Sequence, residues 1–243
     1  MTNTKGMTMP QIDDAELFGN AEDQRAYEDF CASQEAVEKF TLDKPALVCR
    51  WRMSNKKVPM LNRHIRALSE RLVQGEPLTH NMLSWAKQHV EWSLAEGDYT
   101  AHDGVLMLVI DVNGNAAMTV GEYEPLTDTS AKALRARSAE ARSEADETGV
   151  APELLAAVDN GELAFVAPAD ECLCGTATLI EQLAQTKGIP VTRVDIPAQL
   201  KGALFLVSDE HGVVPADDTD AAEADAATVA FFADGYEKLR ARR

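Results

Sequence analysis

The segment 162–196, ELAFVAPADECLCGTATLIEQLAQTKGIPVTRVDI, carries the pattern that decides the fold. Its first residues, Glu162 to Val166, read as a strand, and a turn at Cys172 to Thr176 leads into a helix predicted from Thr178 to Lys187. Gly188 ends that helix, because glycine adopts the left-handed conformation at helix ends without strain. IPVTRV then reads as the next strand. This order of elements predicts helices layered on a sheet.

The surrounding residues extend this unit in both directions. Asp159-Asn160-Gly161 is a hairpin turn that joins a strand at 154–158 to the strand at 162–166. Further elements are expected as a helix at 130–148, a single turn at 197–200, a strand at 203–208, an extended piece at 212–216 and a closing helix at 228–240. Residues 130–243 are therefore expected to form a C-terminal α/β subdomain.

The first half reads as a second, smaller α/β subdomain over residues 21–125. Its expected elements are a helix at 21–40, a hairpin of strands 45–52 and 58–61, a helix at 63–74 capped by Asn62, a helix from Thr79 or Asn81 to Leu94, and a hairpin of 105–111 with 116–123 around Asn113-Gly114. Residues 1–20 are expected to be disordered, and 125–129 to connect the subdomains. The fold class is α+β.

Charge and apolar content restrict the partners. The net charge is −17, which repels phosphate backbones and anionic lipid headgroups, so nucleic acid and membranes are not expected as partners. The first 20 residues lack an apolar stretch, and the run Val105 to Ile110 is far too short to span a bilayer. We therefore expect a cytoplasmic protein. Cys172 and Cys174 lack further ligands at metal-binding spacing, so no metal site is expected.

Four features of the sequence could carry chemistry, and each has a plain structural alternative. The turn 173–178 enters a helix N-terminus, which suits an anion such as phosphate or is simply a capped glycine turn. Lys132 could form a Schiff base or be a solvated helix lysine. His64 could be a ligand or a core histidine, and His211 could be a base beside two acids or part of a solvated turn.

Three blocks, in this order, resemble the class IV pyridoxal-phosphate (PLP) enzymes, which include branched-chain and D-amino-acid aminotransferases and aminodeoxychorismate lyases. The blocks are VPMLNRHIRALSERL (58–72) with the following helix and VLMLVID, then residues 162–196, then ALFLVSDEHGVVPADD (203–218). The closing helix with Tyr236 to Leu239 is also similar to the family. The resemblance implies two α/β subdomains, as in the D-amino-acid aminotransferases, with the pocket between them and a homodimeric assembly.

The resemblance also implies roles for particular residues. Lys132 would form the Schiff base with PLP. The phosphate of the cofactor would be held by Arg66, Gly175, Thr176, Thr178 and Ser208, and the carboxylate of an amino-acid substrate by Arg50 or Arg52.

The sequence departs from the family pattern at several of these positions. Ala67 stands where the family has its phosphate-binding arginine, Asp209 and Glu210 bring carboxylates to the second phosphate turn, and no segment supplies the glutamate for the pyridine nitrogen. Two interpretations follow. The chain is a divergent PLP-dependent aminotransferase or lyase acting on an amino acid or an aminodeoxychorismate-type substrate, or it is a pseudoenzyme that has lost PLP and serves as a binding or protein-interaction protein.

Overall fold

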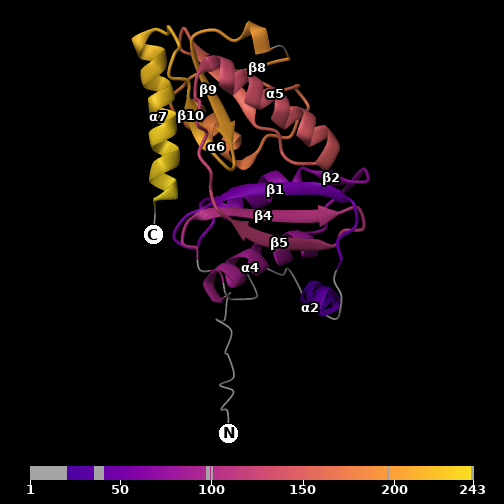
Figure 1. Ribbon diagram of the computed structural model, residues 1–243. Coiled ribbons are helices and arrows are strands. Elements are labelled where there is room, and N and C mark those ends of the chain that lie inside the picture. The colour runs from indigo at the N-terminus through magenta and orange to yellow at the C-terminus, as the bar shows by residue number, and fades with distance from the viewer. Residues whose placement is uncertain (1–20, 36–40, 97–98, 100, 196, 242–243) are drawn as a thin grey trace.

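The computed structural model describes residues 21–35, 41–96, 99, 101–195 and 197–241. The predicted disordered segment 1–20 lies outside the described residues. Within them the chain builds two larger sheets, one of three strands in the order β1-β4-β5 and one of five in the order β10-β9-β6-β7-β8, and a two-stranded sheet of β2 and β3. In Figure 1 the three-stranded sheet lies below the five-stranded one.

The three-stranded sheet consists of β1 (Pro45–Met53), β4 (Gly104–Asp111) and β5 (Ala116–Gly121), all antiparallel. Three helices accompany it: α2 (Ala21–Glu35), α3 (Leu61–Ser69) and α4 (His80–Glu96). The face that carries Trp51, Leu106 and Leu108 is buried in one core cluster with residues of α3 and α4. Thr79 caps α4, since its Oγ1 accepts a hydrogen bond of 3.2 Å from the Met82 amide.

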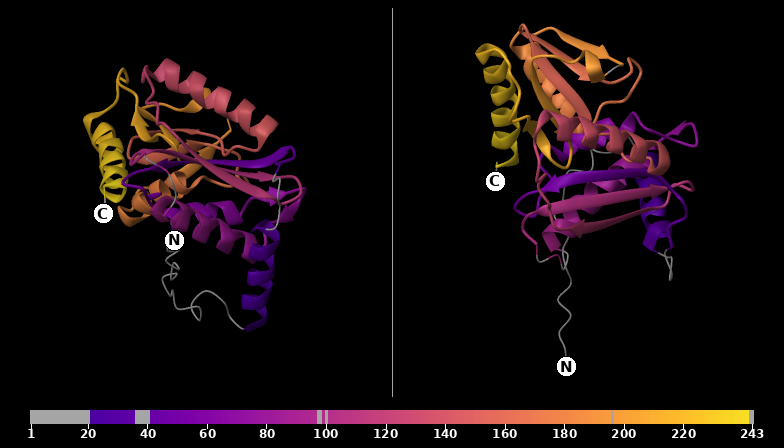
Figure 2. Two further views of the ribbon diagram at one scale, coloured as in Figure 1. Left: turned by 60° about the horizontal axis from the view of Figure 1, so that its bottom comes forward. Right: turned by 45° about the horizontal axis from the view of Figure 1, so that its top comes forward.

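The five-stranded sheet consists of β6 (Leu154–Asp159), β7 (Glu162–Val166), β8 (Val191–Val194), β9 (Ala203–Ser208) and β10 (Gly212–Pro215). Only β7 and β8 run parallel, because α6 (Gly175–Thr186) forms the crossover between them. One face packs on α6 and α7 (Glu223–Arg240), and the other packs on α5 (Ala131–Thr148). Figure 2 shows α5 and α7 well apart, on the two sides of this sheet. Burial on both faces explains the continuous apolar runs of β6 and β9.

Two backbone contacts join the two halves at β1. The Val48 amide donates to the Gly149 carbonyl at 3.2 Å, and the Arg52 amide donates to the Asp209 carbonyl at 2.9 Å. Gly149 ends α5 with φ of 70°, and a Cβ at this position would lie 1.7 Å from the Ala46 carbonyl oxygen. Only glycine therefore permits this approach of α5 to β1.

Two predictions for the first half are wrong. Residues 58–61 do not form a strand: Asn55 and Lys56, both with positive φ, make a tight turn with one bridge between Ser54 and Lys57, and β1 pairs with β4 instead. Pro59 lacks an amide for further pairing, and the chain enters α3 at Leu61. The predicted helix 63–74 ends early, at Ser69. Gly75 forms the turn of a small hairpin, β2 (Leu72–Val73) with β3 (Glu76–Pro77), rather than a helix end.

Two helix starts also differ from the predictions. Helix α6 begins at Gly175 rather than Thr178, and α7 begins at Glu223 rather than Thr228. The first turn of α7 contains Glu223 and Asp225, and negative side chains are favourable at a helix N-terminus. Among the described residues, no helix combines the length and apolarity needed to cross a bilayer.

We predict that Asp111→Ala lowers the free energy of unfolding by about 2–4 kcal/mol at neutral pH. Asp111 is buried, and its carboxylate accepts hydrogen bonds from Asn113 N, Asn115 N and Asp43 N at 2.8, 2.9 and 3.0 Å. Burial alone would raise the pKa of Asp111, but these bonds and that from the Asn115 side chain lower it. The stabilisation is therefore present at neutral pH and is lost as the pH falls through the folded-state pKa. Urea unfolding checks this; Asp170→Ala, at an exposed turn, is the control, and equal effects of the two changes would contradict the assignment.

Candidate functional site at the N-terminus of helix α6

The N-terminus of α6 is capped by a carboxylate from a different segment. Cys174 holds the N-cap position in an extended conformation, with φ of −67° and ψ of 162°, and its side chain makes no capping hydrogen bond. The free amides of the first turn are instead satisfied by Asp209, whose Oδ1 accepts from Thr176 N at 2.7 Å and whose Oδ2 accepts from Gly175 N at 3.2 Å. The Asp209 carboxylate thus occupies the anion-binding position of this helix.

His64 of α3 lies on the other side of the same carboxylate. Its Nδ1 is 3.2 Å from Asp209 Oδ2, and the exposed fractions of the two side chains are 3% and 10%. The indole of Trp51 stacks on the imidazole, with centroids 5.4 Å apart and planes at 22°. Burial would raise the pKa of Asp209, but the charge of His64 and hydrogen bonds from His64 and Thr176 outweigh burial and lower this pKa to about 2.

The close approach of α3 to α6 requires a glycine at the first position of α6. A Cβ on Gly175 would lie 2.5 Å from His64 Nδ1, far inside van der Waals contact. Arg63 of α3 adds a second link, because its Nη1 donates to Thr178 Oγ1 at 3.1 Å. The Thr178 hydroxyl in turn donates to the Gly175 carbonyl at 2.8 Å. These contacts fix the position of His64 over the helix end.

A small cavity lies next to this pair, between the two halves. Its walls include Trp51, His64 and Ala67 from the first half and Cys174 and Asp209 from the second. Its volume is about 30 Å³, whereas pockets for small-molecule ligands measure roughly 300–1,000 Å³. Burial raises the pKa of Cys49 to about 12 and the pKa of Cys174 well above its usual value, so neither thiol is a ready nucleophile.

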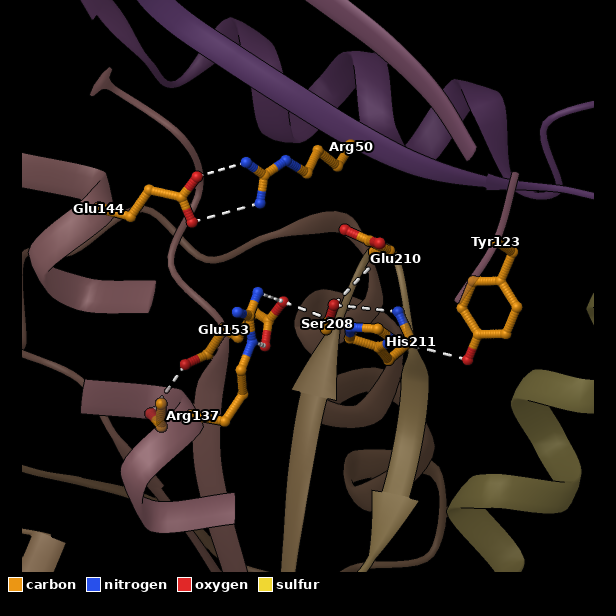
Figure 3. A network of polar contacts seen from close by, with 9 residues as sticks. Arg50, Tyr123, Arg137, Glu144, Glu153, Ser208, Glu210 and His211 are labelled. Carbon is orange, nitrogen blue, oxygen red and sulfur yellow. Dashed lines mark hydrogen bonds and ion pairs between the residues drawn. The ribbon is translucent and has the colours of Figure 1, made fainter. Parts of the chain in front are cut away.

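A second polar network lies beside the cavity, as Figure 3 shows. Arg137 of α5 forms two hydrogen bonds of 2.9 Å to Glu153, and Arg50 pairs with Glu144 of the same helix. The adjacent groove has a volume of about 540 Å³ and is lined by Arg50, Val105, Met107, Thr119, Val120, Gly121, Glu122, Glu124, Pro125, Leu126, Thr127, Arg137, Glu210 and His211. The groove therefore presents charges of both signs.

The structure brings some of the predicted site residues together. Gly175 and Thr176 bind Asp209, and Thr178 lies one turn further along the helix. The Ser208 hydroxyl accepts hydrogen bonds from the amides of Glu210 and His211, both at 3.0 Å, and so closes its own turn. These four residues therefore lie at or near the α6 N-terminus.

Of the predicted cationic residues Arg50, Arg52 and Arg66, only Arg50 lines the cavity beside the α6 N-terminus. Arg66 is exposed, and its Nε donates to the Asn62 carbonyl of its own helix at 3.3 Å. Arg50 is engaged by Glu144, and the guanidinium of Arg52 lies over the ring of Tyr123, 3.2 Å from its centroid. Arg50 lines both the small cavity and the groove, whereas Arg52 and Arg66 line neither of them.

Lys132 is exposed at the start of α5 and lines neither hollow. The residues through which α5 contributes to the small cavity are Arg137, Ala141 and Glu144. At 1.5 Å and 100° per residue they lie about 8–18 Å further along the helix and roughly 120–180° around it from Lys132. The lysine therefore faces away from the α6 N-terminus.

Comparison with known proteins places the fold. No family model matches the sequence, and no curated protein sequence matches it. Solved structures do match. A Legionella pneumophila protein assigned as a 4-amino-4-deoxychorismate lyase gives a TM-score of 0.54 at 11% identity, covering 83% of this chain and 97% of its own. A Thermotoga maritima protein assigned as a branched-chain amino acid aminotransferase gives 0.53 at 14%, covering 85% and 92%.

A third match, a hypothetical aminotransferase from Mycobacterium tuberculosis in its PLP-bound form, gives a TM-score of 0.51 at 13% identity, covering 82% of this chain and 94% of its own. The chain therefore has the fold of the class IV aminotransferases and aminodeoxychorismate lyases. The resemblance seen in the sequence is confirmed as a shared α+β fold.

We predict that Asp209→Asn makes the free energy of unfolding less dependent on pH between pH 4 and pH 2. The folded-state pKa of Asp209, about 2, lies below that of an unfolded aspartate, about 3.9. The charged carboxylate therefore contributes about 2 kcal/mol above pH 4, and this contribution is lost as the pH falls from 4 to 2. Urea unfolding at several pH values should show the variant less stable at pH 7 and nearly equal to the wild type at pH 2. A constant difference across this range would contradict the assignment.

Proposed function

We propose that this chain is a protein of the class IV fold that does not use PLP and that serves as a binding or protein-interaction protein. The observation that carries the proposal is the Asp209 carboxylate on the amides of Gly175 and Thr176. This helix N-terminus is where the resemblance implies that the phosphate of PLP would bind. A carboxylate held there by two hydrogen bonds competes with the phosphate for the same donors.

The residues around the α6 N-terminus do not fit a phosphate group. Asp209 and Glu210 bring negative charge to the turn, and like charges at short range repel by about 1 kcal/mol even in water, and by more in a protein. The position expected for a neutralising arginine is Ala67, and Arg66 is exposed on its own helix. A helix N-terminus alone contributes up to about 2 kcal/mol, and here Asp209 already uses it.

The remaining groups that PLP would need are also out of place. Lys132 points away from the α6 N-terminus, and the cavity between the halves, about 30 Å³, is too small for a cofactor. The residues present therefore do not fit PLP. The fold has been kept while the groups that carry the chemistry have changed, which is common among proteins of one fold.

The alternative function, a divergent aminotransferase or lyase, has one observation in its favour. The groove of about 540 Å³ carries Arg50 and Arg137 together with Glu122, Glu124 and Glu210. Charges of both signs in one groove suit the carboxylate and ammonium groups of a small amino acid. Such a molecule is thus a candidate ligand under either function.

We predict that millimolar PLP leaves the melting temperature of the wild type unchanged and forms no pyridoxyl adduct after borohydride reduction, as judged by mass spectrometry. Asp209→Ser removes the competing carboxylate, so inorganic phosphate should raise the melting temperature of this variant and not that of the wild type or of Asp170→Ser. A ligand at a hundred times its dissociation constant stabilises by about 2.7 kcal/mol, which is easily measured. Stabilisation of the wild type by PLP, with an adduct that Lys132→Ala abolishes, would restore the enzyme interpretation.

We also infer a homodimer in the cytoplasm. All four cysteines are free thiols, as is usual in a reducing compartment. Strand β5 is an edge strand, and the sheet face that α4 does not cover carries the half-buried residues Met107, Val109 and Ala117. An edge strand with apolar neighbours favours association with a second copy.

Sedimentation equilibrium at tens of micromolar protein should therefore give about twice the chain mass of 26.4 kDa. Ala117→Glu, which puts a charge on this face, should shift the protein toward the monomer, whereas Ala169→Glu at an exposed turn should not. A monomeric wild type would refute the dimer.

A further inference from the structure

We propose that Glu153, Glu210 and His211 form a binding site for a transition-metal dication, with Zn²⁺ as the best match. One ligand atom from each residue can be chosen so that all three lie within 4.8 Å of one another. Glu153 directly precedes β6, and the other two residues form the turn between β9 and β10. Figure 3 shows Glu153 between Arg137 and His211, with Glu210 above them. The site is separate from the α6 N-terminus and does not depend on whether PLP binds.

The imidazole of His211 is positioned for metal coordination. Its side chain is only 5% exposed, and Nε2 lies 3.8 Å from Glu153 Oε1. The other ring nitrogen, Nδ1, is 3.4 Å from the hydroxyl of Tyr123. With Nδ1 protonated and donating to Tyr123, the Nε2 lone pair faces the Glu153 carboxylate and is available to a cation between them. A hydrogen bond on the second nitrogen is the usual support of a metal-binding histidine.

Burial is the main effect on His211 and lowers its pKa. Glu153 and Glu210 act against this shift, and Arg137 and Arg52 act with it. The effects of two acidic and two basic side chains on the pKa of His211 therefore oppose each other.

Both carboxylates retain free acceptor capacity. Glu153 accepts one hydrogen bond from Arg137 on each oxygen, both at 2.9 Å, and each carboxylate oxygen has a second lone pair. Within the part of the chain that the structure describes, the carboxylate of Glu210 makes no hydrogen bond or ion pair. Its backbone is nevertheless held, since its amide donates to Ser208 Oγ at 3.0 Å. The cluster thus offers one nitrogen and two oxygen ligands, from the residue before β6 and from the turn between β9 and β10.

The ligand set indicates which metal fits. Mg²⁺ and Ca²⁺ prefer oxygen ligands alone, whereas one imidazole with two carboxylates suits Zn²⁺ and similar ions. Glu210 and His211 also line the groove of about 540 Å³, so a fourth coordination position would open to it. Such a three-residue site with an open position can bind water or a further ligand.

The test is titration calorimetry of metal-free full-length protein with ZnCl₂. The wild type should bind one ion per chain, and His211→Ala and Glu210→Gln should each weaken binding at least tenfold. Tyr123→Phe, which removes only the support of the imidazole, should weaken it by about tenfold. The matched control is Glu124→Gln, which changes a glutamate in the same groove outside the cluster and should leave binding unchanged. Circular dichroism confirms that each variant is folded, and Glu210→Gln alters only a turn side chain.

Three results would overturn the site. The first would be that the wild type does not bind Zn²⁺ at micromolar concentrations. The second would be that His211→Ala and Glu210→Gln bind Zn²⁺ as tightly as the wild type, which would assign the ion to other histidines or to the thiols. The third is that excess Mg²⁺ displaces Zn²⁺ completely, because an imidazole ligand should prevent this.

Discussion

The contact of the Asp209 carboxylate with the N-terminus of α6 is the interaction on which the relation between the two halves depends. Asp209 receives hydrogen bonds from Gly175 and Thr176, lies 3.2 Å from His64 of α3, and accepts the Arg52 amide of β1 on its carbonyl oxygen at 2.9 Å. One residue thus links the five-stranded sheet to the strand and the helix of the smaller half. A buried carboxylate is stable only when it is fully hydrogen-bonded or paired. Movement of either half would break some of these bonds, so the joint resists opening.

The same contact is the basis of the proposed function. A helix N-terminus favours an anion of any kind, because its free amides donate hydrogen bonds and the helix dipole is positive there. In this chain the anion is the Asp209 side chain, and the imidazole of His64 lies 3.2 Å from it. The protein therefore satisfies internally the donors that the resemblance assigns to a cofactor. The neighbouring groove, with its glutamates, arginines and His211, is left as the larger hollow available for ligands.

Much of the fold was predictable because its signals are local. The turns Asn113-Gly114 and Asp159-Asn160-Gly161 and the apolar strands on either side of them were placed correctly, as was the helix capped by Ser130. The predicted hairpin 45–61 was wrong because the tight turn at Asn55 suggests that the next residues pair with the strand at 45–52. The strand that actually pairs with β1 is β4, much later in the chain. Non-local pairing of this kind leaves no trace in short-range spacing.

The candidate site was only partly predictable for the same reason. The sequence pointed to the α6 N-terminus and to carboxylates at Asp209 and Glu210. It did not indicate that Asp209 binds the α6 N-terminus or that His64 lies beside the Asp209 carboxylate. These residues come from distant segments, and nothing in their spacing indicates that they touch. The preference of helix N-termini for anions, applied to Asp209 itself rather than to a ligand, was the signal that could have found the pair. The turn that carries Glu210 and His211 was noted in the sequence, but nothing in the sequence links Glu153 to it.

The most direct test of the central claim is to follow the backbone amide resonances of Gly175 and Thr176 by nuclear magnetic resonance as the pH is lowered and as PLP is added. The account predicts that both amides are shifted as hydrogen-bonded groups at neutral pH, that they titrate with the pKa of Asp209, about 2, and that millimolar PLP or phosphate leaves them unchanged. Amides that ignore acid titration yet shift on addition of PLP would show that the helix end is open to the cofactor, and would contradict the account.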